Sequence, residues 1–346
     1  MPPFIIPFFL THEGCPHRCL YCDQRRSGGG RAARLDAEEA AGRLEAGLAS
    51  PRHRPGQRVE AAFYGGTFTA LPRSRQQDFL QAARPFLANG RVHGVRVSTR
   101  PDALEKDEVV FLKEQGVTAV EIGAPSMDDE VLKRAGRGHG AAEVEAASGR
   151  VRAAGMRLGL QLLPGLPGED RASLRATLEA VLALSPDEVR LYPALVIMDT
   201  GLDRLYLNGA FRPWTLDQAV GLLAWMHVRL TRAGVRVTRV GLQETPELMA
   251  GLRAGPHHPA LGYLVRSAVY ARALARTFRR RPEILKNPAV IHVAPADWSE
   301  ALGPGRSHLK RLSRAFGLDR LRIEADVRLP RSRFRWQGEE YDVYAA

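Results

Sequence analysis

The order of apolar segments constrains the fold of this 346-residue chain more than any other feature of its sequence. Continuous apolar segments of strand length alternate with segments of helical period, a pattern typical of parallel βαβ units whose sheet is covered on both faces. The expected strands are residues 4–10, 59–64, 92–98, 119–123, 156–163 and 188–195, and the expected helices are residues 37–49, 75–87, 104–115, 141–153 and 171–184. About six such units suit a partial barrel better than a flat doubly wound sheet, although periodicity alone does not separate the two.

After the alternating region the sequence predicts two more elements of the first domain and then a smaller second domain. A further helix at residues 216–233 and a strand at residues 235–242 follow the alternating region. The C-terminal region predicts a strand at 289–294, a basic helix at 306–316 and a strand at 321–329, which together suggest a small basic α+β extension. We therefore expect two domains, residues 1–245 and residues 246–346.

All the cysteines of the chain lie in one short segment directly after the first expected strand. Cys15, Cys19 and Cys22 have the spacing Cys-x₃-Cys-x₂-Cys, which lets three thiolates bind three irons of a cubic iron–sulfur cluster. Because the sequence contains no fourth cysteine, the remaining iron would be open to another molecule. The spacing therefore predicts a cluster that takes part in chemistry.

Two other roles for the cysteines compete with the cluster. A disulfide framework is disfavoured because the number of cysteines is odd and their spacing is tight. A structural zinc site could recruit His12 or His17 as a fourth ligand, but such sites usually draw on two separated pairs. The adjacent His257 and His258 are a weak ligand pair, and we expect a structural or substrate-facing turn there.

The cysteine segment resembles the cluster motif of the radical S-adenosylmethionine (SAM) superfamily, Cys-x₃-Cys-x-aromatic-Cys, with Tyr21 as the aromatic residue. The resemblance implies a [4Fe–4S] cluster whose open iron binds the amino and carboxylate groups of SAM. An electron from a flavodoxin- or ferredoxin-type donor would cleave SAM to methionine and a 5′-deoxyadenosyl radical, which takes a hydrogen atom from a substrate. It also implies a partial barrel, with the backbone at Tyr21 against the adenine.

The second expected strand ends in a glycine pair, Gly65 and Gly66, followed by Thr67. Glycines let a backbone approach a ligand without side-chain obstruction. At this distance after the cysteines they resemble the superfamily's glycine-rich motif, which implies a contact with the SAM amino group. Thr67 occupies a position that is usually acidic.

Later strand ends resemble one branch of the superfamily, the radical SAM domain of the Elongator catalytic subunit and its stand-alone bacterial relatives. The shared runs, over residues 4–265, are Thr-Arg-Pro-Asp at 99–102, Glu-x-Gly at 121–123, Arg-Gly-His at 137–139 and Leu-Pro-Gly at 163–165. The resemblance implies that Arg100, Glu121 and Gln161 contact the carboxylate, ribose or adenosyl portion of SAM. It assigns no residue to the chemistry on the substrate.

The chain departs from that branch in two places. Pro125 stands where relatives commonly have glutamine, so an amide that could orient SAM or substrate is lost or replaced. The C-terminal region has no glycine-rich pyrophosphate loop, since the cluster at residues 303–306 lacks the required spacing. Transfer of an acetyl group from acetyl-CoA is therefore not expected.

The charge of the chain suggests a polyanionic partner. The net charge is +12, and residues 246–346 hold 18 Lys+Arg against 10 Asp+Glu. Candidate surfaces are Arg25, Arg26, Arg31 and Arg34 after the cysteines, the run Arg279-Arg280-Arg281, and the run 331–336, in which arginines alternate with Phe334 and Trp336. Cations interleaved with aromatic residues are typical of RNA-binding surfaces, although a merely solvated basic face has equal standing.

The composition agrees with a cytoplasmic enzyme. With 45% hydrophobic residues, the chain can bury a large core. The apolar run at residues 1–10 is too short to span a membrane and lacks the positive region of a signal peptide. Cysteines clustered as metal ligands fit a reducing compartment. We expect no membrane partner.

The sequence therefore predicts a radical SAM enzyme, with RNA, in particular tRNA, as the leading substrate hypothesis. One alternative is a small-molecule enzyme similar to the oxygen-independent coproporphyrinogen dehydrogenases. Another is a non-catalytic haem or metal carrier that keeps the cluster.

Overall fold

The computed structural model describes residues 3–16, 18–27, 35–282 and 289–345. The chain divides into two compact units. The first contains Met1–Trp214 and Leu242–Pro256, and the second contains Thr215–Gly241 and His257–Ala346. Relative to the boundary expected after residue 245, Thr215–Gly241 belongs to the second unit, and the first unit continues to Pro256.

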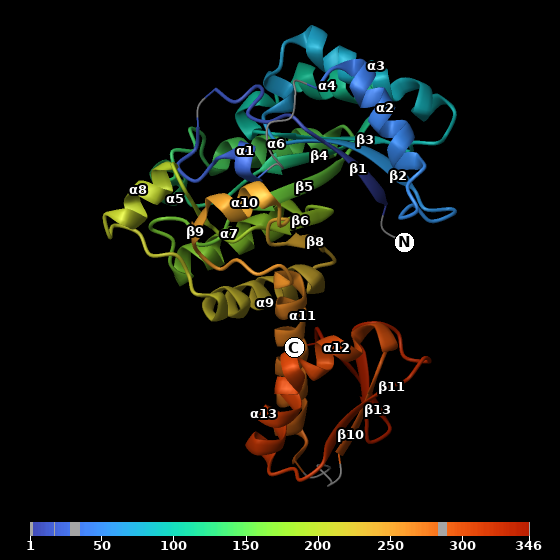
Figure 1. The fold of residues 1–346 in the computed structure, drawn as a ribbon, viewed down its shortest axis with the longest axis vertical. Helices are drawn as coiled ribbons and strands as arrows, with labels where there is room; N and C mark the ends of the chain where they lie inside the picture. Colours follow the sequence, from blue (N-terminus) through green and yellow to red (C-terminus); the bar gives the residue numbers. More distant parts are fainter. Residues whose placement is uncertain (1–2, 17, 28–34, 283–288, 346) are drawn as a thin grey trace. The chain divides into compact units, whose positions relative to one another are not determined.

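The main sheet is parallel, with seven strands in the order β1-β2-β3-β4-β5-β6-β8. Its strands are β1 (Phe4–Phe9), β2 (Val59–Tyr64), β3 (Val95–Thr99), β4 (Val117–Gly123), β5 (Arg157–Leu162), β6 (Glu188–Leu191) and β8 (Arg236–Val240). From β1 to β6 each strand pairs in parallel with the next strand along the chain, and helices lie outside the sheet (Figure 1). The predicted partial parallel α/β barrel is confirmed.

Several helices of the first unit begin at residues whose side chains cap the helix. They are α1 (Gln24–Ser27), α2 (Ala37–Leu48), α3 (Arg73–Ala88), α4 (Lys106–Glu114), α5 (Asp129–Arg134), α6 (Ala141–Ala153), α7 (Arg171–Leu184), α8 (Gly201–Leu207) and α10 (Pro246–Gly251). Asp36, Asp128 and Asp170 accept backbone N–H groups at the starts of α2, α5 and α7. The first unit also contains a short antiparallel pair, β7 (Val196–Ile197) with β9 (Leu252–Ala254).

Aromatic packing joins the first two strands to α3. The rings of Phe8 and Phe63 are stacked with centroids 5.0 Å apart, and Phe63 lies 5.3 Å from Phe79 of α3. All three side chains are buried. This packing fixes the outer face of β1 and β2, and with it the point at which the cysteine segment leaves β1.

The inner face of the sheet is charged. Arg96 of β3 is buried and pairs with Glu60 of β2 (3.1 Å), Glu121 of β4 (2.9 Å) and Glu188 of β6. A buried cation is tolerated only when it is paired and hydrogen-bonded. The four side chains therefore hold the inward faces of these strands in one relative arrangement.

The second unit contains a four-stranded mixed sheet of order β11-β10-β12-β13. Its elements, besides β8, are α9 (Leu216–Arg232), α11 (Leu261–Arg280), β10 (Ala289–Val293), α12 (Trp298–Leu302), α13 (Ser307–Phe316), β11 (Leu321–Ala325), β12 (Arg333–Trp336) and β13 (Glu339–Asp342). The strand expected at 321–329 ends at Ala325, because Asp326 then accepts hydrogen bonds in a turn from the backbone and guanidinium of Arg328. The predicted small α+β extension is confirmed.

Local packing explains why segments change units near residue 245. In the second unit, Arg272 of α11 donates to the carbonyl of Gly221 in α9 at 3.0 Å. In the first unit, Thr245 donates to the carbonyl of Arg26 at 3.4 Å, and the Met198 N–H donates to the carbonyl of Gly251 at 2.8 Å. Each segment therefore belongs to the unit with which it forms these bonds.

The structure contradicts the aromatic part of one predicted RNA surface, the run 331–336. Phe334 and Trp336 are completely buried, with the ring of Trp336 4.8 Å from that of Phe278. The arginine between them is engaged with a carboxylate, since Arg335 pairs with Asp326 at 2.8 Å. The alternation of arginine and aromatic residues is the two-residue period of β12, with its aromatic face in the core.

In the described part of the chain, we find no helix with the length and apolar character that crossing a bilayer requires.

Replacing Trp336 with alanine tests its place in the core. The cavity should lower the free energy of unfolding by about 3–5 kcal/mol in chemical denaturation. Val327, which is 86% exposed, is the control, and its alanine variant should stay within about 0.5 kcal/mol of the parent. If the Trp336→Ala protein were as stable as the parent, the placement of Trp336 in the core would be contradicted.

Candidate active site

The cysteine segment is fastened to the end of β2 by backbone and side-chain hydrogen bonds. The Gln24 amide oxygen accepts from the N–H groups of both His12 and Gly66, so a single side chain joins the segment to the strand end. The bonds are Leu10 N to Tyr64 O (2.8 Å), Thr67 N to Glu13 O (2.7 Å), Gly66 N to Gln24 Oε1 (2.8 Å) and His12 N to Gln24 Oε1 (2.5 Å). These bonds hold the segment against the end of β2. We call it the cysteine loop (residues 10–23).

Two glycines allow this close approach. A Cβ on Gly66 would lie 2.2 Å from the Glu13 carbonyl oxygen, and a Cβ on Gly14 would lie 2.2 Å from the Thr67 carbonyl oxygen. Both glycines also have positive φ, +40° and +72°, where side chains are disfavoured. The glycine at the end of β2 thus has a structural task, which is to let the cysteine loop cross the strand end.

The three thiols lie on this one loop, with Cys19 buried and Cys15 and Cys22 half-buried. The Sγ of Cys15 is 3.5 Å from the Thr67 hydroxyl, and the Sγ of Cys19 accepts a hydrogen bond of 3.3 Å from Arg137. Burial, together with the nearby Cys19 and Cys15, raises the pKa of Cys22 to about 12. Cys15 therefore lies beside the residue that follows the second glycine of β2's end, Thr67, and Cys19 lies beside Arg137.

The donor set fits an iron–sulfur cluster better than a single metal ion. Among the residues that the structure describes, no three His, Cys, Asp or Glu side chains gather as ligands of one ion would. His12 Nε2, a zinc ligand under the alternative, accepts a hydrogen bond of 3.0 Å from the backbone of Gln24, and His17 lies outside the described residues. A cubic cluster binds each thiolate at a separate corner, so its ligands need not converge on one point.

Arg137 links the cysteine loop to the end of β4. Its guanidinium is buried and donates to Cys19 Sγ, to the Gly123 carbonyl (2.9 Å) and to His139 Nε2 (2.8 Å). Burial and the charge of Arg137 lower the pKa of His139 to about 4, so that this imidazole is a neutral acceptor at pH 7. In the sequence Arg137 belongs to a family motif, but nothing in its spacing indicates a contact with a cysteine.

Glu121 and Gln161 lie on the same inward face of adjacent strands. In the β4–β5 register Glu121 is opposite Gly159 and Gly123 is opposite Gln161, and residues two apart share a face. One Glu121 oxygen accepts from Arg96 and Arg190 at 2.9 Å each, whereas its Oε2 is buried and has no hydrogen-bond partner in the described part of the chain. A buried acceptor without a donor is rare, and a ligand hydroxyl group would satisfy it.

Arg100 differs from this arrangement. Its buried guanidinium forms a bidentate ion pair with Asp102, at 2.9 and 2.8 Å. Arg100 therefore pairs with a carboxylate of its own chain, and its contact with SAM stays a prediction. Pro125 contributes its carbonyl, which accepts from the Leu163 N–H at 2.9 Å, and so helps to hold the end of β5.

Two residues beside Glu121, Arg190 and Tyr64, were not among the predicted site residues. Arg190 of β6 donates to the Tyr64 hydroxyl at 2.5 Å, and its guanidinium lies 4.4 Å from the centre of the Tyr64 ring. A charged residue at the inward position of a short apolar strand was the available signal. Together with Glu121 they form a polar layer on the inward face of the sheet. The layer lies toward the carboxyl ends of the strands, where ligands bind in parallel α/β folds.

Tyr21 contributes its ring to the hydrophobic core. It packs on two apolar clusters, one containing Leu166 and Ala194 and the other containing Leu202 and Phe211. The ring is therefore directed away from water, which is compatible with the prediction that only the backbone of Tyr21 faces a ligand.

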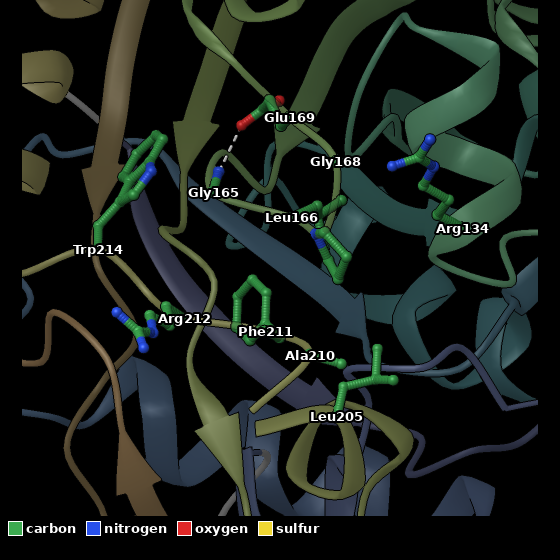
Figure 2. Close-up of a pocket in the computed structure, with 11 residues that line it drawn as sticks. Arg134, Gly165, Leu166, Gly168, Glu169, Leu205, Ala210, Phe211, Arg212 and Trp214 are labelled. Atoms are coloured by element: carbon green, nitrogen blue, oxygen red, sulfur yellow. Dashed lines mark hydrogen bonds between the residues drawn. The ribbon is translucent and has the colours of Figure 1, made fainter. Parts of the chain in front are cut away.

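A pocket of about 470 Å³ is lined in part by Leu166 and Phe211, which belong to the two apolar clusters that contact Tyr21. Its volume is within the range of small-molecule sites. Figure 2 shows its lining residues, namely Arg134, Gly165 to Glu169, Leu205, Ala210, Phe211, Arg212 and Trp214. Glu169 Oε2 accepts from the Gly165 N–H at 2.5 Å, and burial raises the pKa of Glu169 to about 7. Gly165, the last residue of the Leu-Pro-Gly run, and the four residues after it thus form one wall of this pocket.

Other predicted positions have structural partners. Arg25 and Arg26 both pair with Asp23, at 3.2 and 3.6 Å, whereas Arg31 and Arg34 lie outside the described residues. His258 Nδ1 accepts from the backbone of Ala260 at 3.0 Å, which is consistent with the expected structural turn.

Replacing Gly66 with alanine tests the interlock between the cysteine loop and β2. The clash with Glu13 and the positive φ should lower the free energy of unfolding by at least about 2 kcal/mol. Gly42 is the control, because it lies inside α2 and a Cβ added there would have nothing within 4 Å, and Gly42→Ala should raise stability by about 0.5–1 kcal/mol. Equal stability of the Gly66→Ala and parental proteins would contradict the interlock.

Comparison with known proteins agrees with this geometry. A family model described as the radical SAM superfamily matches residues 9–181, and one described as the radical SAM C-terminal domain matches residues 186–271. The tRNA uridine(34) acetyltransferase of Dehalococcoides mccartyi (strain CBDB1) is 30% identical over 222 residues, covering 58% of this chain and 48% of that protein. Elongator complex protein 3 of Mus musculus is 27% identical over 206 residues, covering 53% of this chain and 37% of that protein.

The fold has also been observed in solved structures. An archaeal Elp3 from Methanocaldococcus infernus, with its N-terminus deleted, superposes with a TM-score of 0.65 at 21% identity and covers 83% of this chain and 71% of that one. This chain spans about half the length, or less, of the curated relatives named above. The cysteine loop on a partial parallel barrel and the two family matches show that the chain belongs to the radical SAM superfamily.

Proposed function

We propose that Cys15, Cys19 and Cys22 hold the [4Fe–4S] cluster that membership of the radical SAM superfamily implies, and that SAM binds between the cysteine loop and the inward face of β4 and β5. The cluster, when bound, supplies the electron that cleaves SAM to methionine and a 5′-deoxyadenosyl radical. The observation that supports this most is the buried Oε2 of Glu121, which has no partner in the described part of the chain.

The polar residues of the barrel have separate tasks in this proposal. Glu121 is held by Arg96 and Arg190, so its second oxygen stays oriented to accept a hydrogen bond from a ribose hydroxyl. Gln161, on the same face, can donate and accept through its amide. Gly65, Gly66 and Thr67 contribute backbone near the SAM amino group.

We further propose RNA, in particular tRNA, as the substrate class. The curated relatives are named as tRNA uridine(34) acetyltransferases and Elongator subunits, and the net charge of +12 favours a polyanion. Acetyl transfer is not part of the proposal. A flavodoxin- or ferredoxin-type donor in the cytoplasm would supply the electron.

Anaerobic reconstitution tests the cofactor assignment. The protein should be brown, bind about four irons and release 5′-deoxyadenosine when reduced with SAM. Cys19→Ala should lose both the colour and the product, and retention of either would contradict the assignment. Running the assay with and without bulk tRNA should show higher 5′-deoxyadenosine yield with tRNA.

The alternatives give different results in the same assay. A cluster without SAM cleavage, together with a Soret band on mixing with haem, would favour a carrier. SAM cleavage that is indifferent to tRNA but stimulated by a tetrapyrrole would favour the small-molecule enzyme.

Arg137 should tune the cluster through its contact with Cys19. Removing the buried cation disfavours the extra electron of the reduced state, so Arg137→Gln should lower the midpoint potential by about 60 mV, the one-electron equivalent of a tenfold change. Arg137→Lys should recover part of this shift. Lys133→Gln, an exposed change on the neighbouring α5, should leave the potential unchanged, as measured by spectroscopic redox titration. A potential unaffected in Arg137→Gln would contradict the role.

A further inference from the structure

Three helices of the second unit, α9, α11 and α13, pack together and carry more cations than anions. The 20 residues of α11 include five arginines and no acidic residue, and the sequence of α13, SHLKRLSRAF, also lacks one. The ring of Phe278 on α11 meets that of Phe316 on α13 edge-on, with centroids 5.3 Å apart. Arg272 of α11 donates to Gly221 of α9, so the helices are held by direct contacts (Figure 1).

Five arginines from these helices gather into what we call the arginine face, which consists of Arg232, Arg272, Arg276, Arg280 and Arg311. Arg272, Arg276 and Arg280 are one turn apart on the same side of α11. Burial and Arg311 lower the pKa of Arg272, and burial, Arg232 and Arg280 lower the pKa of Arg276. The strongest charges around these two guanidinium groups are therefore other cations.

Several other arginines of the same unit are paired with carboxylates. Arg281 pairs with Glu339 at 2.9 Å, Arg328 with Asp326 at 2.9 Å, and Arg331 with Asp297 at 2.7 Å. In contrast, Arg272, Arg276 and Arg311 form no ion pair with any carboxylate in the described part of the chain. Like charges held together raise the energy of the free protein, and a bound polyanion lowers it.

We propose that the arginine face binds the phosphate backbone of RNA. Guanidinium groups match phosphate oxygens in bidentate geometry, and several of them along α11 would follow successive phosphates. A membrane surface fits less well, because helices that lie in a membrane interface carry large apolar residues on the face that enters the lipid. The large apolar side chains found exposed are Phe9, Val110, Leu207, Met249, Trp298 and Val327, and these lie outside α9, α11 and α13.

This inference deepens the RNA part of the proposed function and rests on it for the identity of the polyanion. It moves the contact from the run 331–336, where the aromatic residues are buried, to the helical side of the same unit. The surface is independent of the cysteine loop, so the two proposals can fail separately.

The test compares two triple variants of the full-length protein that lose the same charge. The first is Arg272→Gln/Arg276→Gln/Arg311→Gln, and the second, Arg281→Gln/Arg328→Gln/Arg333→Gln, removes exposed arginines that are paired with carboxylates. Binding of a fluorescein-labelled, unmodified tRNA transcript is followed by anisotropy between 50 and 200 mM salt. The first variant should bind at least about tenfold more weakly at 100 mM salt, with a slope of log K against log salt shallower by about 2, and the second should resemble the parent.

Several outcomes would overturn the proposal. Equal weakening in both triple variants would show an effect of net charge alone. If the first triple variant lost binding to phosphatidylserine vesicles but bound tRNA as the parent does, the face would be assigned to a membrane. Undetectable tRNA binding by a parent protein that still forms 5′-deoxyadenosine would remove the face while leaving the radical chemistry intact.

Two controls keep the result interpretable. The first triple variant should melt within a few degrees of the parent and form 5′-deoxyadenosine without tRNA at the parental rate, since none of its residues lies at the candidate active site. Should it fail to fold, the single exposed change Arg311→Glu on α13 replaces it. That variant should also bind tRNA more weakly than the parent, and unchanged binding by it would equally contradict the proposal.

Discussion

The buried ion-pair network around Arg96 is the interaction on which the rest of the barrel depends. One guanidinium is shared by carboxylates from β2, β4 and β6, and Arg157 adds a second cation to Glu60. Removing one member of such a buried network would strand the charge of the others, at a cost of about 3–5 kcal/mol. The network therefore specifies which faces of the strands point inward and at which height, as hydrophobic packing alone would not.

The candidate active site inherits its order from this network. Glu121 belongs both to the network and to the polar layer with Arg190 and Tyr64, so the orientation of its second oxygen follows from the pairing of the first. At the next level along the strands, Gly123 accepts from Arg137, which in turn reaches Cys19. Barrel interior, strand ends and cysteine loop are thus connected by consecutive polar contacts.

Sequence patterns predicted the elements well and their connections poorly. The strands of the barrel were predictable because each is a short apolar run between helices of regular period, and the cysteine spacing indicated its chemistry directly. The partial barrel was predictable only from family resemblance, since its inward face is held by Arg96, whose partners lie up to 92 residues away in the chain. The sequence indicates only a ligand contact for Gly66, because its close approach to Glu13 involves a carbonyl that no local pattern reveals. Likewise, the alternation of arginine and aromatic residues at 331–336 is the same whether the aromatic face contacts RNA or packs in a core. Only the tertiary packing of the strand distinguishes the two.

The interlock of Gly14 and Gly66 has a consequence for how the protein matures. A zinc finger folds around its metal, so binding and folding are one event. Here the loop that carries the thiols is already pinned to the barrel by the chain's own hydrogen bonds, and its ordering entropy is lost when the barrel forms. The chain's own hydrogen bonds therefore do part of the ordering that the metal does in a zinc finger, and cluster binding should add less to folding here.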